Sequence, residues 1–332
     1  MTAFLNGLIL LIVAAISYGT PLMFGTLGEI LTEKSGNLNL GVEGIMFMGG
    51  AFGLGGVFYY EKIVGAGNGN GIVAIIVGIF FAFLAGMFAS LIFSFLTTTL
   101  RTNQNVTGLA LSIFGTGVGQ FTGELMRVKA GGYVTISNEL KVFFSDSPFP
   151  KALTEIPYVG QLIFGHSVFF YLGILLAIFL HLYLNKTRSG MFLKAVGENP
   201  ATADAAGINV ARNKYLATII GGGISAVGGM VYITSIAQCV WNHEGLSGVG
   251  WLAVALVIFC LWRPLSSIWG SVLFGALMIM YLRFPLKFIP TDIYKILPYV
   301  VTIAVLILTS LRNNKEKQPP ASLGLPFFRE ER

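Results

Sequence analysis

A run of thirty residues without a single charge, from Gly71 to Leu100, constrains the fold more than any other feature of this sequence. A helix that crosses a bilayer needs about 20 predominantly apolar residues, and this run exceeds that length. Charged residues make up 11% of the chain, whereas a soluble domain carries roughly 25%. Such a chain cannot cover a water-facing surface of its own, so we predict an all-α, polytopic transmembrane helical bundle.

Apolar runs of spanning length recur from end to end, and they predict about nine to ten spans. Their approximate bounds are 4–27, 40–60, 71–98, 104–122, 167–184, 212–237, 248–264, 267–285 and 295–311. Two runs are ambiguous, since 40–60 contains Glu43 and seven glycines and 104–122 starts with polar residues. Either can be a continuous helix or a broken, re-entrant one. Irregular backbone survives at membrane depth only where protein packs around it or where it lines a cavity.

The distribution of Lys and Arg sets the expected orientation, because basic residues favour the cytoplasmic side. With the C-terminus inside, thirteen of the 21 basic residues fall in cytoplasmic connections. Nine spans then place the N-terminus outside. We expect the first apolar run to be retained as a helix rather than removed as a signal peptide, because residues 1–5 carry no basic side chain.

Two long polar connections separate the apolar runs. The external one, about 123–166, contains three prolines and scattered charges of both signs, and we expect it to form an ordered cap or docking surface. In the cytoplasmic one, about 185–214, Asn199 is typical of a helix cap, Pro200 of a first helical position and Gly207 of a helix stop. These three residues predict a short helix on the cytoplasmic face.

The domain organisation follows from these features. We expect residues 1–312 to form one transmembrane domain and residues 313–332 to form a cytoplasmic C-terminal tail. The tail is polar and contains Pro319 and Pro320, and we expect disorder near its end.

Four stretches of the sequence resemble a known family. Thr187–Ala217 (TRSGMFLKAVGENPATADAAGINVARNKYLA) is similar to the coupling loop, and Glu33–Gly53 (EKSGNLNLGVEGIMFMGGAFG) to an early hallmark segment, of the permeases that serve nucleosides and simple sugars in bacterial ABC importers. Arg101–Gly115 and Ile156–Ser167 also match the pattern of that family. The likeness covers roughly residues 20–312 and belongs to the branched-chain-amino-acid and ribose-type permease superfamily. Within it, the nucleoside permeases come nearest and the ribose-type sugar permeases next.

The resemblance implies a multi-pass protein of the bacterial cytoplasmic (inner) membrane that takes up nucleosides, or a related simple sugar, by ATP-driven transport. Its implied partners are an ATP-binding ABC subunit, a second permease that is a related but different chain, and an extracytoplasmic substrate-binding lipoprotein. ATP and Mg would be bound by the ATPase partner. A short cytoplasmic helix would fit a groove of that ATPase and convert its closure into movement of the permease. The residues implied in this coupling are Gly197, Glu198, Asn199, Pro200, Ala203, Asp204, Ala206 and Gly207.

The candidate translocation path consists of polar residues in or beside spans: Asn39, Glu43, Asn103, Asn105 and Thr107. An ionisable residue within a span is a functional candidate, but Glu43 lies near a membrane edge, where it can instead pair with a lysine or a helix terminus. Asn39 can equally cap a helix. The cluster from Asn103 to Thr107 can line the path or form an interhelical hydrogen-bond clamp.

The sequence contains none of the patterns that chemistry in this chain would need. It has no GxxxxGK[ST] phosphate loop, no HExxH and no GxSxG. Its two cysteines and three histidines lack metal-ligand spacing, and four tryptophans near span ends are typical of interfacial anchors. We therefore expect no catalytic residues, no metal and no cofactor in this chain, which would be a transport subunit and not an enzyme.

The alternative is a stand-alone secondary transporter or channel for a small polar solute. Inverted repeats and charges at the membrane midplane would favour it. The sequence shows no clear repeat and places only one acidic residue, Glu43, inside a span. The formal charge of +6 is spread along the chain, so it indicates membrane topology rather than nucleic-acid binding.

Overall fold

The computed structural model describes residues 2–283, 291–311 and 318–328, and within these ranges the chain is helical and contains no β-strand. Five of the described helices are long and apolar enough to cross a membrane. They are Gly7–Glu33, Val42–Val64, Gly71–Thr99, Val168–Lys186 and Val210–Ile236. The prediction of an all-α transmembrane bundle is confirmed.

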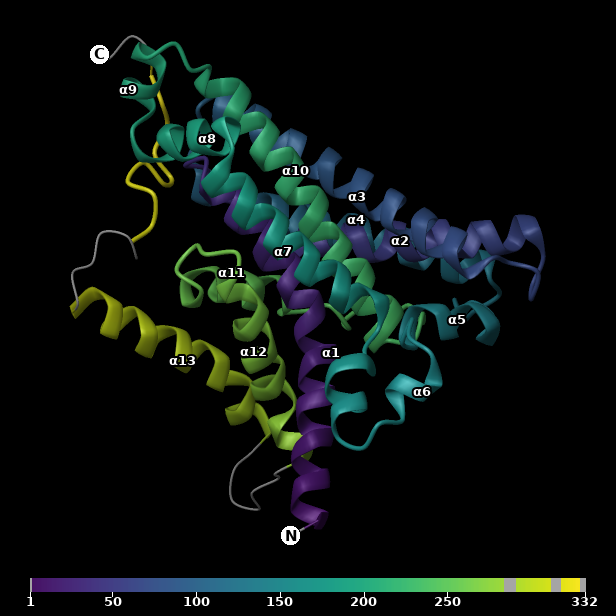
Figure 1. Cartoon of the computed structure of the whole chain (residues 1–332). Coiled ribbons are helices and arrows are strands. Elements are labelled where there is room, and N and C mark those ends of the chain that lie inside the picture. The colour runs from purple at the N-terminus through teal and green to yellow at the C-terminus, as the bar shows by residue number, and fades with distance from the viewer. Residues whose placement is uncertain (1, 284–290, 312–317, 329–332) are drawn as a thin grey trace.

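Four helices form the centre of the bundle (Figure 1): α1 (Thr2–Glu33), α2 (Val42–Val64), α3 (Gly71–Ser94) and α10 (Val210–Val231). Small residues let their backbones approach closely. A Cβ atom at Gly49 of α2 would lie 2.0 Å from the carbonyl oxygen of Ala226 in α10, so only glycine fits there. The glycines of the ambiguous run 40–60 therefore serve helix packing, and α2 is a continuous helix.

The remaining long helices surround this centre. α4 (Gln104–Lys129) packs along α2, and α7 (Val168–Lys186) packs on α1. α4 is also continuous, which settles the second ambiguous run, and at 26 residues it is about 39 Å long. α12 (Ser266–Arg283) lies against α1, and α13 (Thr291–Leu311) lies beside α11 and α12 at the edge of the molecule (Figure 1).

One predicted span is wrong. The run 248–264 forms α11 (Val249–Phe259), whose 11 residues extend about 16 Å, well short of the roughly 30 Å of a hydrocarbon core. The preceding segment, 237–248, has an irregular backbone and contacts other helices through hydrogen bonds. The non-helical backbone expected within the bundle thus precedes α11 instead of interrupting α2 or α4.

The external connection is ordered, as predicted. α4 continues to Lys129, so the connection begins later than residue 123, and it contains α5 (Asn138–Ser145), α6 (Lys151–Thr154) and a π-helical turn (Gly160–Phe164). The buried Glu61 of α2 accepts two hydrogen bonds from the Ser137 amide, at 3.0 and 3.1 Å, at the start of α5. This contact fixes the connection to the bundle. Its role as a docking surface stays a prediction.

Part of the C-terminal tail is folded against the helical domain. Residues 318–328 are folded against the connection 185–214, and we name this segment the C-terminal clasp. The prediction of disorder near the chain end concerns residues 329–332, which lie outside the described residues. The clasp is ordered because its backbone amides and its apolar side chains, Leu323 and Phe327, find partners in the helical domain.

Candidate functional site

The connection 185–214, which we predict to be cytoplasmic, contains two helices, α8 (Arg188–Glu198) and α9 (Pro200–Ala205). The predicted start and stop of the short helix are confirmed. The Asn199 side chain accepts a hydrogen bond from the Thr202 amide at 3.0 Å, Pro200 occupies the first helical position, and Gly207 ends the turn with a φ of +83°. α8 was not predicted, although Thr187, which caps it through the Gly190 amide at 3.1 Å, is a readable signal.

α9 has two different faces. Its inner residue Ala203 is buried with Val196 and Val210, and Phe327 of the C-terminal clasp packs against these three. The other small residues of the turn are exposed. They are Ala201, Ala205, Ala206 and Gly207. A surface without large side chains lets a partner approach the helix backbone closely.

The C-terminal clasp joins α8 to the segment that follows α1. Gly324 donates its amide to the Gly36 carbonyl at 3.1 Å, and the Ala321 amide donates to Glu198 at 3.3 Å. A Cβ at Gly197 would lie 2.4 Å from the Lys34 carbonyl oxygen, so the end of α8 touches the segment after α1 directly. One connected block lies beneath α9. It consists of the end of α8, the clasp and residues 34–41.

Glu43 has a structural role in this arrangement. Its carboxylate accepts hydrogen bonds from the amides of Gly248 and Gly250, both at 2.6 Å, and of Trp251 at 3.2 Å. These amides lie at the N-terminus of α11, where a negative charge is favourable. Of the two readings left open by the sequence, the structure favours pairing with a helix terminus, and the terminus belongs to α11.

Two buried carboxylates at the end of α1 were missed. Glu29 and Glu33 are 1% and 2% exposed, because α1 continues six residues beyond the predicted end of the span at residue 27. The Asn39 amide donates to Glu29 at 3.2 Å, and the indole of Trp262 donates to Glu33. The Asn37 amide group donates to the Thr218 hydroxyl at 3.0 Å. We name Glu29, Glu33, Asn37, Asn39 and Trp262 the polar core.

Two expectations change with the polar core. Trp262 is buried against Glu33 and is not an interfacial anchor. The Asn39 side chain accepts from the Gly41 amide at 2.9 Å, which is an Asx turn before α2 and not a cap of that helix. Glu33 and Trp262 also line a cavity of about 800 Å³. Glu29 and Glu33 are four residues apart and continue the helical period of the first apolar run, 4–27. This spacing is the sequence signal that could have revealed the polar core.

The other three candidate path residues, Asn103, Asn105 and Thr107, lie at the start of α4. The Asn103 side chain caps α4 by accepting from the Val106 amide at 3.1 Å, Thr107 donates to the Asn103 carbonyl at 2.8 Å, and Asn105 is exposed. Asn103 and Thr107 line a mainly apolar cavity of about 480 Å³ between α3 and α4, and neither Asn39 nor Glu43 reaches its wall. The five residues therefore do not share one cavity.

No three His, Cys, Asp or Glu side chains gather as a metal site within residues 2–283, 291–311 and 318–328. The described site thus consists of a capped helix with a small exposed face, a clasp that connects it to the bundle, and a buried polar core. The long apolar helices around this site are those of a multi-pass membrane protein. Residues 11–306 match the family described as "Branched-chain amino acid transport system / permease component", and the chain belongs to that family.

Full-length relatives agree with this assignment. The guanosine ABC transporter permease protein NupQ of Bacillus subtilis is 30% identical over 97% of this chain and 98% of its own. The nucleoside ABC transporter permease protein NupC of Lactococcus lactis is 30% identical over 91% and 93%. TsgC13 of Haloferax volcanii, provisionally named a glucose ABC transporter permease, is 32% identical over 96% and 97%. A solved structure of an inward-facing ABC transporter is similar with a TM-score of 0.42 and 13% identity, over 91% of this chain and 85% of that chain.

Proposed function

We propose that this chain is the membrane-spanning permease subunit of an ATP-driven importer that takes nucleosides into the cell. The observation that carries the proposal is α9, a capped helix between two spanning helices whose outer face exposes only small side chains. NupQ and NupC, named for guanosine and for nucleosides, support the solute class. A simple sugar is the second candidate, since TsgC13 is named for glucose.

The partners follow from the same proposal. ATP and Mg bind to a separate ATPase, because this sequence has no phosphate loop and no catalytic constellation. An extracytoplasmic lipoprotein delivers the solute, and a second, related permease chain completes the path. The chain itself catalyses no reaction.

We assign the predicted coupling residues distinct roles. Asn199, Pro200 and Gly207 set the limits of α9, so that the helix is rigid enough to transmit a displacement. Ala206 lies on the exposed face that enters the ATPase groove. Ala203 carries the movement inward to Phe327.

The movement then reaches the bundle through the C-terminal clasp. Gly197 and Glu198 bind the clasp, and the clasp binds Gly36 in the segment that leads to the polar core. Asp204 lies on the wall of a separate cavity between α9 and α10. This route connects the ATPase surface with the buried carboxylates of α1.

We place the solute path along the wall formed by Glu33 and Trp262. Their cavity of about 800 Å³ lies within the range of small-molecule pockets, about 300–1,000 Å³. An indole offers a stacking surface for a base, and a carboxylate accepts hydrogen bonds from sugar hydroxyls. Asn39 supports this wall. Glu43 anchors α11, and Asn103, Asn105 and Thr107 shape the start of α4.

Reconstitution tests the proposal. Liposomes that contain this chain, its partner permease, the ATPase and the lipoprotein should accumulate labelled nucleosides when ATP is present, with glucose as the comparison solute. The chain alone should transport nothing. Ion-driven uptake by the chain alone would instead identify a secondary transporter. Replacing residues 197–207 by a Gly/Ser linker should abolish copurification of the ATPase.

A further inference from the structure

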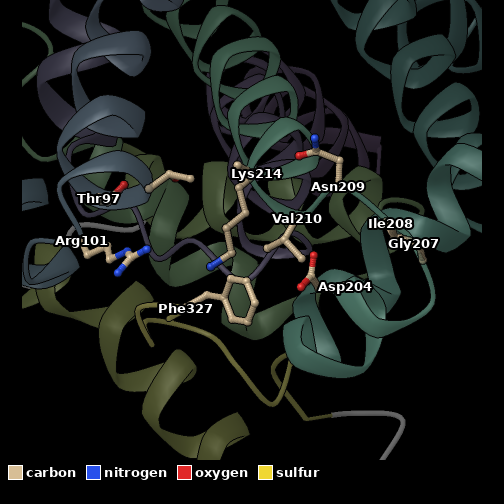
Figure 2. A pocket seen from close by; sticks show the side chains of 11 residues that line it. Thr97, Arg101, Asp204, Gly207, Ile208, Asn209, Val210, Lys214 and Phe327 are labelled. Carbon is tan, nitrogen blue, oxygen red and sulfur yellow. The ribbon is translucent and has the colours of Figure 1, made fainter. Parts of the chain in front are cut away.

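A second cavity, of about 450 Å³, lies at the end of the molecule that carries α9. Figure 2 shows side chains from four elements facing it: Thr97 and Arg101 after α3, Asp204 of α9, Lys214 of α10 and Phe327 of the C-terminal clasp. None of its lining residues lines the Glu33–Trp262 cavity. It is therefore separate from the proposed solute path.

Lys214 is the unusual feature of this cavity. The residue is 2% exposed, and among the described residues no carboxylate or other acceptor bonds to its ammonium group. Figure 2 shows the ammonium pointing into the cavity, toward the side where Arg101 lies. A buried charge is costly unless it is paired. Lys214 therefore lacks an ion-pair partner within the part of the chain that the structure describes.

Three further features favour an anion. The guanidinium of Arg101, which lies 4.9 Å from the centre of the Phe328 ring, faces the same space. The Thr98 hydroxyl, on the cavity wall, is buried and has no hydrogen-bond partner in the described structure. Val210 and Ala211, at the N-terminus of the 22-residue α10, also line the wall, and a helix N-terminus attracts anions.

The described wall of the cavity carries charges of both signs. Asp204 is the only acidic residue among the lining residues given, and it lies on the side of the cavity away from Arg101 (Figure 2). Two cations and a helix N-terminus oppose one carboxylate.

We propose that this cavity binds a phosphate group. An ammonium, a planar guanidinium fork, a hydroxyl and a helix terminus approach from several directions, which suits the oxygens of a phosphate. The volume leaves room for an organic group on the phosphate, because it falls within the range of small-molecule pockets, about 300–1,000 Å³. The phosphate belongs either to a soluble phosphate ester or to the headgroup of an anionic lipid.

The position of the cavity gives the bound phosphate a consequence for transport. α9 and Phe327 form part of its wall, and both belong to the proposed coupling route. An anion that bridges Arg101 and Lys214 would hold the end of α3 against the start of α10 beside α9. The inference goes beyond the import of an uncharged solute and does not depend on which solute is carried.

Binding to the full-length chain in nanodiscs tests the proposal. In phosphatidylcholine discs, inorganic phosphate and uridine monophosphate are titrated while the thermal unfolding midpoint is recorded. A second series uses discs that contain phosphatidylglycerol. We expect a saturable rise of the midpoint in at least one series. A rise with the soluble probes identifies a phosphate ester site, and a rise with phosphatidylglycerol alone identifies a lipid headgroup site.

Lys214→Met is the decisive variant, since methionine fills the space of the lysine stem without its charge. It should unfold at the same or a higher midpoint than the wild type without ligand, because an unpaired buried charge is gone. Binding should weaken roughly 10- to 100-fold, the loss expected for a hydrogen bond to a charged group. Lys186→Met, at an exposed lysine of α7, is the matched control and should bind as the wild type does.

Arg101→Gln provides a second test if Lys214→Met does not fold, and it should also weaken binding. The proposal is overturned if no probe raises the midpoint of the wild type. It is equally overturned if Lys214→Met, or Arg101→Gln in its place, binds with the affinity of the wild type.

Discussion

Ser322 donates two hydrogen bonds to the carbonyl oxygen of Gly197, from its backbone amide at 3.0 Å and from its hydroxyl at 2.6 Å. Gly197 lies in the last turn of α8, where helix carbonyls have no partner within the helix. The clasp supplies that partner from 125 residues away. The chain thus uses its own C-terminal segment to fix the base of α9.

Deleting residues 318–332 should uncouple transport from ATP hydrolysis. α9 keeps its own cap, so the ATPase should still copurify, whereas the block beneath α9 loses its connection to Gly36. We expect ATP-driven uptake to fall by about tenfold, in line with coupling free energies of 1–3 kcal/mol. Uptake and ATPase copurification are measured on the same preparations.

The single substitution Phe327→Ala refines this test, because it removes only the apolar contact with Ala203 and its neighbours. It should reproduce part of the uptake defect, and Phe327→Leu should restore most of it. Normal uptake after the deletion would show that the clasp is not part of the coupling route.

Asn199→Ala should weaken binding of the ATPase. The substitution removes the hydrogen bond to the Thr202 amide and destabilises a six-residue helix by about 1 kcal/mol. ATPase affinity should then fall roughly fivefold, because 1.4 kcal/mol corresponds to a factor of ten. Asn199→Asp is the matched control, since aspartate caps a helix equally well, and its affinity should stay near that of the wild type.

Local chemistry made much of this protein predictable. Charge-free runs of spanning length predicted the bundle, because every segment that crosses lipid must be long, apolar and satisfied in its own backbone hydrogen bonds. The limits of α9 followed from Asn199, Pro200 and Gly207, because capping involves neighbours within a few residues. The resemblance of Thr187–Ala217 and Glu33–Gly53 to a permease family was confirmed by the family match over residues 11–306.

Long-range contacts account for what the sequence did not reveal. Glu33 bonds to Trp262 across 229 positions, and Glu43 reaches the Gly248 amide across 205. No local sequence pattern indicates which distant segment will donate hydrogen bonds to a buried carboxylate. The C-terminal clasp was missed for the same reason, since no local pattern reveals its partners at Gly36 and Gly197.

Glu43→Gln should destabilise the protein without changing the solute it prefers. Glutamine presents an NH₂ group to backbone amides that need an acceptor, so at least one of the three hydrogen bonds is lost. Losing a hydrogen bond to a charged group costs about 1.5–3 kcal/mol, and the unfolding midpoint should drop accordingly. The KM for nucleoside uptake in the reconstituted complex should stay unchanged, because the carboxylate anchors α11. A shift in KM at unchanged stability would instead place Glu43 in the solute path.

Protonation of His166 should destabilise the external connection in mild acid. Its Nε2 lies 2.9 Å from the Leu162 carbonyl oxygen, and its Nδ1 is buried without a hydrogen-bond partner among the described residues. Burial lowers the pKa of His166 below its ordinary value of 6.5. The unfolded chain therefore binds a proton more readily than the folded one, so stability is full above about pH 6.5 and falls as the pH drops below it. Thermal unfolding at pH 7.5 and pH 5 should show this difference in the wild type and a smaller one in His166→Gln. An unchanged pH dependence in His166→Gln would assign the effect to a different group.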